Sequence, residues 1–459
     1  MPMWPCDFTN CQKPAVRTLG DCVFCNRHLC SVHLQPAFHN CPQWEDVDAH
    51  IRATGEANSR EVAELIEKIN ISAFTARASE LRQGIPCSIS LHHYDKAIHS
   101  VMGGMNYHAE INFDDGIKWM ARIRRSNATS PPPVLRDYIL QSEVATLKFL
   151  QKTSVPAPKV FDFALDHADN PVGVGYILME KLPGKSLIWA STNQDQRTKI
   201  MNQLADIFIE LRKYPFDLIG SLDHQGDCHV AALAREALTD FENSGMRTMG
   251  PFSSIKEYYE SEIKLILDLI LRQELYSKHA VDAYLTHRYL FDLIPLVSSS
   301  SVQSDQNFYL KHADDKGDHI LVDEEFNITG IIDWEWAHTA PSSLAFNSPI
   351  GLLPVGEFYE GVNNLGHDEN IFVRILEGKG HGYLADCVRN GRLQHRFSFC
   401  KGYELSMDWD GFLGLFQGLR DAVEKDSGVD WETWRAATLH RYREDDGLQI
   451  LLSRLEDIV

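Results

Sequence analysis

The chain has 459 residues, which are too many for a single ordinary hydrophobic core. We therefore expect about three structural units. Hydrophobic residues make up 44% and charged residues 24% of the sequence, as in soluble globular proteins. Lys and Arg total 44 against 64 Asp and Glu, so the formal net charge is −20. Nucleic acids and anionic membranes require basic surfaces, so we expect neither as a partner. Ten cysteines in this length are too few for a disulfide framework.

The sequence shows no targeting segment. Its first ten residues, MPMWPCDFTN, contain neither the basic region nor the apolar run of a secretory signal. The most apolar helical stretch, residues 263–275, carries Lys264, Asp268 and Arg272, which a membrane-spanning helix does not tolerate. We therefore predict a cytoplasmic protein, or one shared between cytoplasm and nucleus, with reduced thiols.

Six of the ten cysteines lie in the first 41 residues, together with three histidines. The spacing is Cys6-x4-Cys11-x10-Cys22-x2-Cys25-x4-Cys30-x2-His33-x5-His39-x-Cys41. These eight side chains supply two complete tetrahedral zinc sites. A segment of this length is too short to bury a real core, so metal binding would supply its folding energy. With four protein ligands neither zinc keeps an open position, which indicates a structural role; disulfides or unrelated thiols are the alternative.

This spacing resembles the AN1-type zinc finger, including the closing Cys-x2-His-x5-His-x-Cys. The resemblance implies two interleaved sites, with His28 outside the pattern. One zinc would be held by Cys6, Cys11, Cys30 and His33, and the other by Cys22, Cys25, His39 and Cys41. Such fingers serve as interaction modules, so the resemblance implies a protein partner and an independently folding module at residues 1–45.

The residues after this module predict a linker and then a small β-rich lobe. Residues 46–58 are charged and show no sustained period, which predicts the linker, and helical spacing begins at Ser59 and ends before Pro86. Two β-rich runs within residues 105–123 predict a hairpin around Asp114-Asp115-Gly116. The pair Gly103-Gly104 precedes it, and a helix over 138–150 and a strand over 175–179 follow.

Residues 308–341 carry the most informative pattern. Residues 320–322 and 328–332 read as two strands around a turn; Asp314 precedes the first strand and Asp333 follows the second. Two carboxylates at opposite ends of a hairpin can face one cleft. Phosphoryl transfer uses such a pair, one to orient the attacking hydroxyl and one to hold Mg²⁺ on the nucleotide phosphates.

This segment is similar to the aminoglycoside phosphotransferase and choline kinase-like enzymes, especially their fungal relatives. Their pattern is His-Gly-Asp-x4-Asn, then Ile-Leu-Val-Asp and Ile-x-Gly-x-Ile-Asp-Trp-Glu, and this chain matches it at His312, Asp314, 320–323 and 328–335. The resemblance spans residue 60 to the end. It implies an α+β, bilobal protein kinase-like fold, with a small lobe at 59–184 and a mainly helical large lobe at 185–459. It also implies an ATP-dependent phosphotransferase acting on a hydroxyl group of a small molecule.

The resemblance also implies residue roles. Asp314 would be the catalytic aspartate, His312 would organise its loop, and Asp333 would bind Mg²⁺. The implied nucleotide site comprises Gly103 and Gly104 over the phosphates, Arg122 on the α and β phosphates, Glu143 paired with Arg122, Glu180 in the hinge beside the adenine, and His319. Each residue also has an ordinary structural interpretation as a turn, cap or solvated side chain.

Two positions depart from the pattern. His319 stands where the family has an asparagine that offers Mg²⁺ a hard oxygen, and imidazole is a poor ligand for this ion; Asp315 or Asp318 could replace it. Arg122 stands where kinases have lysine, and its planar fork binds phosphate in a different geometry. Together these changes favour an alternative: a pseudokinase-like binding or scaffold protein with weak or no phosphoryl transfer.

The acceptor is not readable from a motif. In the resembled family, helices after residue 341 line the acceptor pocket, and here they carry Glu404, Asp408 and Asp410. Negative charge there would suit an amine-bearing alcohol or sugar, and a solvated acidic face is the alternative.

Overall fold

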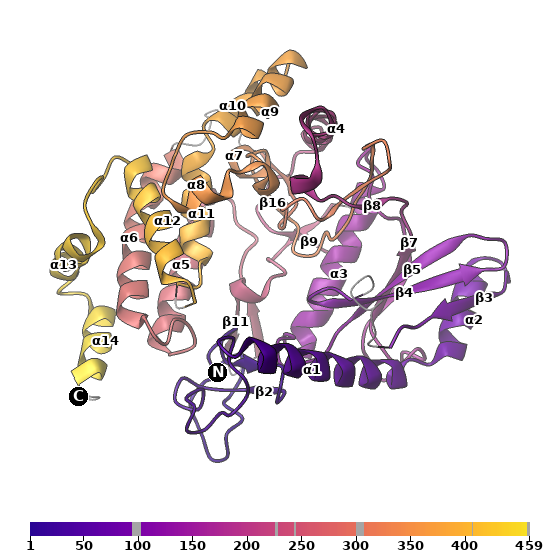
Figure 1. The fold of residues 1–459 in the computed structure, drawn as a ribbon, viewed down its shortest axis with the longest axis horizontal. Coiled ribbons are helices and arrows are strands. Elements are labelled where there is room, and N and C mark those ends of the chain that lie inside the picture. Colours follow the sequence, from indigo (N-terminus) through magenta and orange to yellow (C-terminus); the bar gives the residue numbers. More distant parts are fainter. Residues whose placement is uncertain (94–101, 225–227, 243–244, 300–306, 406, 457–459) are drawn as a thin grey trace.

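A computed structural model describes residues 1–93, 102–224, 228–242, 245–299, 307–405 and 407–456. A five-stranded sheet precedes residue 185, and helices dominate the chain after it (Figure 1). The predicted α+β architecture, a β-rich small lobe followed by a mainly helical large lobe, is confirmed. No helix within these ranges is long and apolar enough to cross a membrane.

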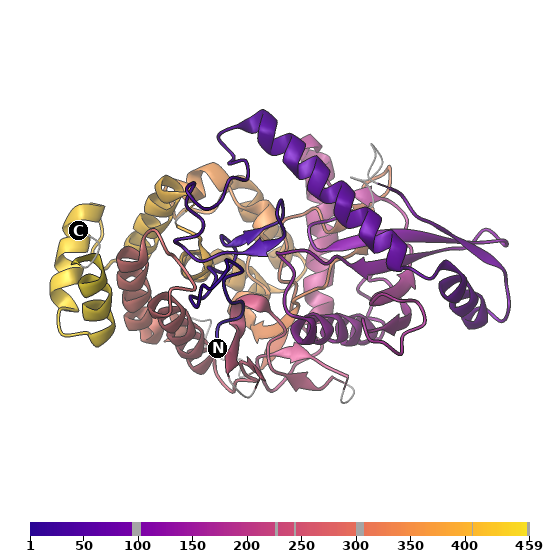
Figure 2. The same cartoon turned by 90° about the horizontal axis from the view of Figure 1, so that it is seen from below.

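The first 41 residues form a small module with one hairpin, β1 (Asp21–Cys22) and β2 (Arg27–His28). Its own core comprises little more than Cys6, Leu29 and Cys30, as expected for so short a segment. Figures 1 and 2 show the module at the junction of the two lobes, beside the start of α1.

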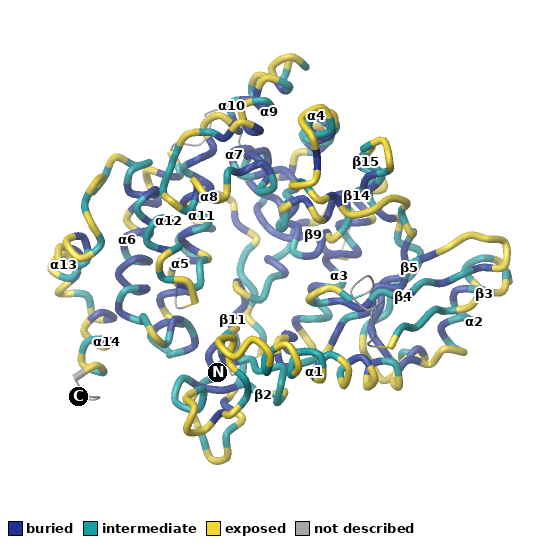
Figure 3. Tube along the Cα trace, viewed as in Figure 1, coloured by how far each residue is buried: buried dark blue, intermediate teal, exposed yellow. Residues whose placement is uncertain are grey.

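Residues 47–58 of the predicted linker are helical and belong to α1 (Val47–Lys68), a helix of 22 residues. The Asp46 side chain caps its start by accepting the Ala49 N–H at 3.1 Å. Most residues in the first half of α1 are exposed or only partly buried (Figure 3), and its apolar residues show no sustained helical period in the sequence. The helical stretch predicted from Ser59 is divided: α2 (Ile71–Leu81) begins after a second cap at Asn70.

The small-lobe sheet has the strand order β3-β4-β5-β7-β6, and every neighbouring pair is antiparallel. The strands are β3 (Cys87–Ser90), β4 (Asn106–Phe113), β5 (Lys118–Arg124), β6 (Val160–Ala164) and β7 (Tyr176–Glu180). The predicted hairpin is confirmed as β4–β5. Alternate residues of β4 are buried with the apolar side of α1 and α2. α3 (Pro133–Leu150), which contains the helix predicted over 138–150, packs into the main core with the large lobe.

The chain crosses between the lobes after β7. Here β8 (Lys185–Ser186) pairs with β14 (Ile320–Val322), which in turn pairs with β15 (Ile328–Ile331). Gly184 at this crossing has φ +102°, and a Cβ atom on it would lie 2.5 Å from Thr329 Oγ1. A residue without a side chain is therefore required for the crossing segment to lie against the β14–β15 hairpin.

One continuous core holds the large lobe together and extends into α3. Its longer helices are α4 (Gln194–Leu211), α5 (Ile255–Leu271), α6 (Ala280–Ser299), α9 (His367–Gly378), α10 (Gly382–Arg389), α11 (Arg392–Gly402), α12 (Trp409–Ala422), α13 (Trp431–Arg441) and α14 (Asp446–Glu456), with the short α7 (Ser342–Ala345) and α8 (Val355–Tyr359) between them. Short strands β9 (Ser221–Leu222), β10 (Val230–Ala231), β11 (Thr239–Glu242), β12 (Gly245–Thr248), β13 (Phe308–Lys311) and β16 (His338–Pro341) pair among these helices.

Candidate functional site

The eight predicted metal ligands form two groups in the predicted combination. Cys6, Cys11, Cys30 and His33 form one group and Cys22, Cys25, His39 and Cys41 the other, with all ligand atoms of a group within 4.8 Å of one another. Cys6 Sγ lies 3.3 Å from His33 Nδ1, and Cys11 Sγ lies 3.9 Å from Cys30 Sγ. Tetrahedral zinc places two sulfurs about 3.8 Å apart and sulfur and nitrogen about 3.6 Å apart. The donor set therefore suits zinc, and since all ten cysteines are free, the disulfide alternative is wrong.

His28 is a structural residue of the module rather than a member of either group. Its Nδ1 lies 3.2 Å from Asp7 Oδ2, and its ring stacks on Trp4 at 4.2 Å. Its exclusion from the spacing pattern thus agrees with its position.

In the large lobe, His312 ties the loop after β13 to the end of β15. Its Nδ1 accepts the Asp314 N–H at 3.2 Å, and its Nε2 lies 2.9 Å from Ile332 O. Since Nδ1 accepts, the ring proton is assigned to Nε2, which donates to Ile332. Burial lowers the pKa of His312, which keeps the ring neutral and able to make both bonds. The loop bearing Asp314 is thereby fixed next to the segment that bears Asp333.

The two predicted carboxylates differ in their surroundings. Asp314 is about one third exposed, and its Oδ2 lies 3.0 Å from Lys316 Nζ. Asp333 is half exposed, and its Oδ1 lies 2.7 Å from Arg122 Nη2. Burial of its surroundings opposes ionisation of Asp333, but the Arg122 charge outweighs it and the pKa of Asp333 is lowered. Asp333 is thus an ionised, accessible carboxylate at neutral pH.

The backbone of Asp333 is strained. Its φ is +63°, in the left-handed region that residues with a side chain rarely adopt. The Ile332 N–H donates to His319 O at 2.9 Å and the Trp334 indole donates to Ile331 O at 2.9 Å, so both sides of Asp333 are held. Strain that the surroundings enforce is typical of residues whose side-chain direction matters for function.

Arg122 connects the small lobe to the Asp333 segment. Its Nη1 lies 2.9 Å from Glu143 Oε1 of α3, the ion pair that the family resemblance implied, and both side chains are almost fully buried. Its Nη2 also lies 2.6 Å from Glu335 Oε2, besides its contact with Asp333. One guanidinium group thus forms ion pairs with three carboxylates. Burial, and then the charges of Glu335 and Asp333 acting against the attraction of Arg122, raise the pKa of Glu143 to about 8.

Glu335 is the residue that sequence reasoning missed, although it was read as part of Ile-Asp-Trp-Glu. It is 3% exposed and is bound by Arg122, by Arg124 and by Asn106, whose Nδ2 donates at 2.9 Å. A signal was present in β5. Arg122 and Arg124 are two residues apart and so share one face of a strand. Two cations facing a core need buried carboxylate partners.

His319 and Asp315 occupy the region of the missing asparagine. His319 Nδ1 accepts the Gly317 N–H at 3.3 Å, its ring lies 4.2 Å from that of His312, and burial lowers its pKa to about 3. Asp315 pairs with Lys311 at 3.2 Å and accepts the Ile350 N–H at 3.1 Å. Asp315 is therefore engaged in structure, whereas Asp318 is exposed.

The remaining predicted nucleotide residues lie in the small lobe. Gly103 and Gly104 form a tight turn before β4, closed by the Gly103 N–H donating to Asn106 O at 2.9 Å. Glu180 ends β7 at the crossing between the lobes, and its backbone N–H donates to Lys159 O at 2.8 Å. The glycine turn is linked to the Arg122 cluster through Asn106, whose Nδ2 donates to Glu335 at 2.9 Å.

Comparison with known proteins now identifies a domain. Residues 128–342 match the model of the phosphotransferase enzyme family. This range contains Glu143, Asp314, Asp333 and Glu335, whereas Arg122 and the metal-binding module precede it. The central part of the chain is thus similar to this family, over slightly less than half of the 459 residues.

Two curated relatives come from fungi, and each matches the chain only in part. A subtelomeric hrmA-associated cluster protein of Aspergillus fumigatus is 35% identical over 130 residues, which are 27% of this chain and 24% of the relative. Clavilactone A biosynthesis cluster protein Y of Ampulloclitocybe clavipes is 24% identical over 259 residues, 54% of this chain and 62% of the relative. The matched part is thus about a quarter of the first relative's length.

Among solved structures, the GDP complex of aminoglycoside 2′-phosphotransferase-IIIa is similar over 77% of this chain and 99% of its own, with 17% identity and a TM-score of 0.40. A similarity at this level identifies neither a shared substrate nor a shared nucleotide.

Proposed function

We propose that the chain is an ATP-dependent phosphotransferase that transfers the γ-phosphoryl group to a hydroxyl group of a small molecule. The observation that carries this proposal is the convergence on Arg122. Its guanidinium lies 2.9 Å from Glu143 and 2.7 Å from Asp333, which joins the small-lobe sheet, α3 and the 331–335 segment at one point. Phosphoryl transfer depends on positioning and charge neutralisation, so a cation and a metal-binding carboxylate held together are its main requirements.

Each predicted residue has a task in this reaction. Arg122 would bind the α and β phosphates, with Glu143 setting its direction. Asp314 would accept the hydrogen bond of the attacking hydroxyl and orient it, and His312 would keep that loop in place. Asp333 offers the hard oxygen that Mg²⁺ requires, and bound Mg²⁺ would neutralise the phosphate charge. Gly103 and Gly104 would cover the phosphates, Glu180 would border the adenine, and His319 would take the place of the family's asparagine.

The proposal extends to the rest of the molecule. Two structural zinc ions would stabilise an AN1-type module that binds a protein partner. An amine-bearing alcohol or sugar fits the acidic residues that precede and begin α12. We place the protein in the cytoplasm, or in both cytoplasm and nucleus.

A second function is favoured by one observation. Asp333 is already paired with Arg122, although half of its side chain is exposed. His319 accepts the Gly317 N–H at Nδ1 and offers Mg²⁺ no oxygen. A pseudokinase-like binding protein would have this arrangement. Turnover of Mg-ATP distinguishes the two functions.

The experiment is the thermal shift of the full chain with ATP and Mg²⁺. We expect the wild type to be stabilised, and Asp333→Ala to lose the Mg²⁺-dependent part of the shift. Glu324→Ala, which removes an exposed carboxylate at the tip of the β14–β15 turn, is the matched control and should shift like the wild type. Equal shifts for Asp333→Ala and wild type would remove Asp333 from the metal site.

A further inference from the structure

Helix α1 contacts the metal-binding module at the peptide between two ligands. Arg60 Nη2 donates to Phe24 O at 3.1 Å and to Val23 O at 3.4 Å. Val23 and Phe24 separate Cys22 from Cys25, so these carbonyl groups belong to the turn that brings the two thiols together. The Phe24 ring also meets His50 of α1 edge-on at 5.1 Å. The turn that carries two ligands of the second Cys/His group is thus in direct contact with α1.

The next residue of α1, Glu61, binds the small lobe. Arg125, the first residue after β5, makes a two-point contact with its carboxylate: Nε to Oε1 at 2.9 Å and Nη2 to Oε2 at 2.6 Å. Asn58, one helical turn earlier, accepts from the same guanidinium at 3.1 Å, and Asn127 Nδ2 donates to Glu61 at 2.9 Å. Both charged side chains are about nine-tenths buried, where a bidentate pair is geometrically specific.

The remaining arm of Arg125 holds the glycine turn. Arg125 Nη1 donates to Gly103 O at 2.8 Å and to Gly104 O at 3.2 Å, and the Arg125 N–H donates to Met105 O at 3.1 Å. In a trans peptide the C=O and the following N–H point in opposite directions. Fixing the two carbonyl groups therefore fixes the N–H groups of Gly104 and Met105 on the side away from Arg125. Glycine has many accessible conformations, so this contact, together with the bond from Gly103 N–H to Asn106 O, restricts which one the turn adopts.

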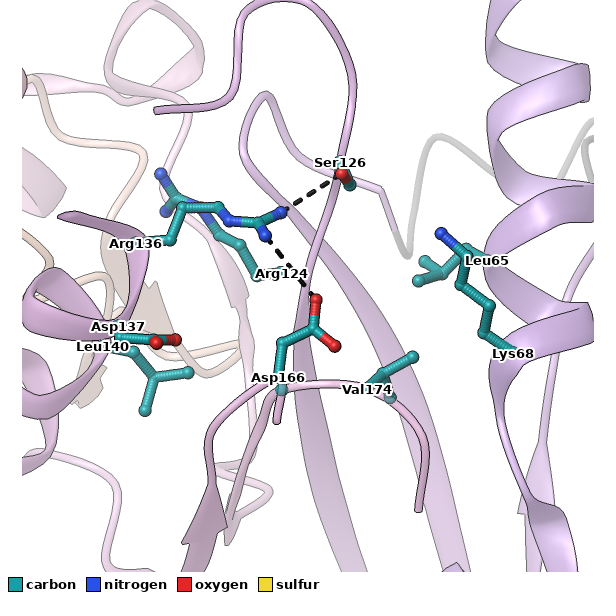
Figure 4. A pocket seen from close by; sticks show the side chains of 10 residues that line it. Leu65, Lys68, Arg124, Ser126, Arg136, Asp137, Leu140, Asp166 and Val174 are labelled. Carbon is teal, nitrogen blue, oxygen red and sulfur yellow. Dashed lines mark hydrogen bonds and ion pairs between the residues drawn. The ribbon is translucent and has the colours of Figure 1, made fainter. Parts of the chain in front are cut away.

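The residues on either side of Arg125 are anchored as well. A small pocket is lined by Leu65 and Lys68 of α1, by Arg124 and Ser126, and by residues of α3 (Figure 4). Arg136 of α3 donates to Ser126 Oγ at 3.1 Å and lies 3.6 Å from Asp166. The segment after β5 is thus held between α1 and α3, and a shift of α1 would move the Arg125 guanidinium relative to the glycine turn.

We propose that Arg125 is a positioning residue for the Gly103–Gly104 turn, and that α1 makes its position depend on the metal-loaded N-terminal module. The helix that contacts the Cys22–Cys25 turn through Arg60 presents Glu61 to Arg125, so loading of the module and nucleotide binding are coupled. This regulation rests on the proposed function of the glycine turn in covering phosphates. The module then acts within its own chain, besides any external partner.

The first test compares full-length Glu61→Gln with the wild type. The control is Glu64→Gln, an exposed carboxylate on the same helix. We expect faster hydrogen exchange at residues 102–105 and about tenfold weaker ATP binding in Glu61→Gln, with unchanged zinc content, because the charge-assisted pair is lost. The control should behave like the wild type. If Glu61→Gln exchanges and binds ATP as the wild type does, the positioning role is overturned. If the wild type binds no nucleotide, the proposed function is refuted instead, because the hydrogen-exchange comparison can be made without nucleotide.

The second test addresses the coupling. Removing zinc from the wild type with a chelator should accelerate exchange at residues 102–105, and the same treatment should add little in Glu61→Gln, where the link is already broken. Arg60→Gln keeps all metal ligands. In its zinc-loaded form, exchange at residues 102–105 should be faster than in the zinc-loaded wild type, but by less than after zinc removal. Equal effects of chelation in wild type and Glu61→Gln, or exchange that ignores zinc in both, would overturn the coupling.

Discussion

Arg17 joins the metal-binding module to the large lobe, and its removal should destabilise the whole protein. Its guanidinium donates to Glu274 Oε2 at 3.0 Å and to Thr239 O at 2.8 Å, and it lies 3.6 Å from Asp240. All four residues are buried. In addition, Met3 of the module packs against Leu135 and Ile139 of α3.

The magnitude follows from the charges left behind. In Arg17→Ala, Arg272 remains near both carboxylates, 2.8 Å from Asp240 and 3.5 Å from Glu274. Breaking a buried ion pair while one partner stays costs about 3–5 kcal/mol. The loss of the donor to the Thr239 carbonyl adds part of about 1–3 kcal/mol, since the terms overlap. We expect a decrease of about 4 kcal/mol in the free energy of unfolding of the large lobe.

The assay is urea unfolding followed by tryptophan fluorescence, with zinc release recorded by a chromogenic chelator. Lys13→Ala, which changes an exposed cation of the same module, is the control. Arg17→Ala should lower the midpoint of the large lobe, while Lys13→Ala leaves it unchanged. An Arg17→Ala midpoint equal to that of the wild type would refute the docking and restore the expectation of an independently folding module.

Three further predictions concern the site and the crossing between the lobes. The pKa of Glu143 is raised from 4.5 to about 8, so the folded protein binds this proton more tightly and loses stability as the pH rises between these values. The urea midpoint of Glu143→Gln should therefore fall less over this pH window than that of the wild type. Midpoints that fall in parallel in the two proteins would contradict the shift. Glu335→Gln removes the buried charge that Arg122 and Arg124 share and leaves Arg122 paired with Glu143, so it should lower the unfolding free energy by about 3 kcal/mol. Glu236→Gln, at the more exposed partner of Arg124, should cost much less by the same assay. Gly184→Ala would meet Thr329 Oγ1 and should lower the melting temperature more than Gly116→Ala, which shares the positive φ but has free space; equal losses would show that strain alone acts.

The parts of the structure that could be predicted from the sequence are those encoded by neighbouring residues. The grouping of Cys6, Cys11, Cys30 and His33 was implied by the resemblance to the AN1-type finger, which rests on a pattern within a short segment. The hairpin β4–β5 follows from two β-rich runs around one turn. Helix α1 was missed for the opposite reason. Its first half is exposed or only partly buried, and polar side chains, Arg60 and His50, make its contacts with the module, so no hydrophobic period marks it.

The candidate site was predictable in its identities but not in its connections. Arg122, Glu143 and Asp333 were found by their positions in a pattern, but the contact of Arg122 with Asp333 and Glu335 joins residues more than two hundred positions apart. Arg125 and Glu61 are likewise distant in sequence, 64 positions apart. Such pairs are set by how the lobes and α1 pack, and no local pattern in a single sequence encodes them.

The most direct measurement is the fate of the γ-phosphoryl group of labelled ATP, with Mg²⁺ and the zinc-loaded full chain, against a panel of hydroxylated amines and sugars and against water alone. We predict Mg²⁺-dependent transfer by the wild type to a hydroxyl acceptor, and its loss in Asp314→Asn, which keeps the size of the side chain but removes the carboxylate that orients the hydroxyl. Label that stays on ATP in every reaction, or transfer that persists in Asp314→Asn, would contradict the proposed function.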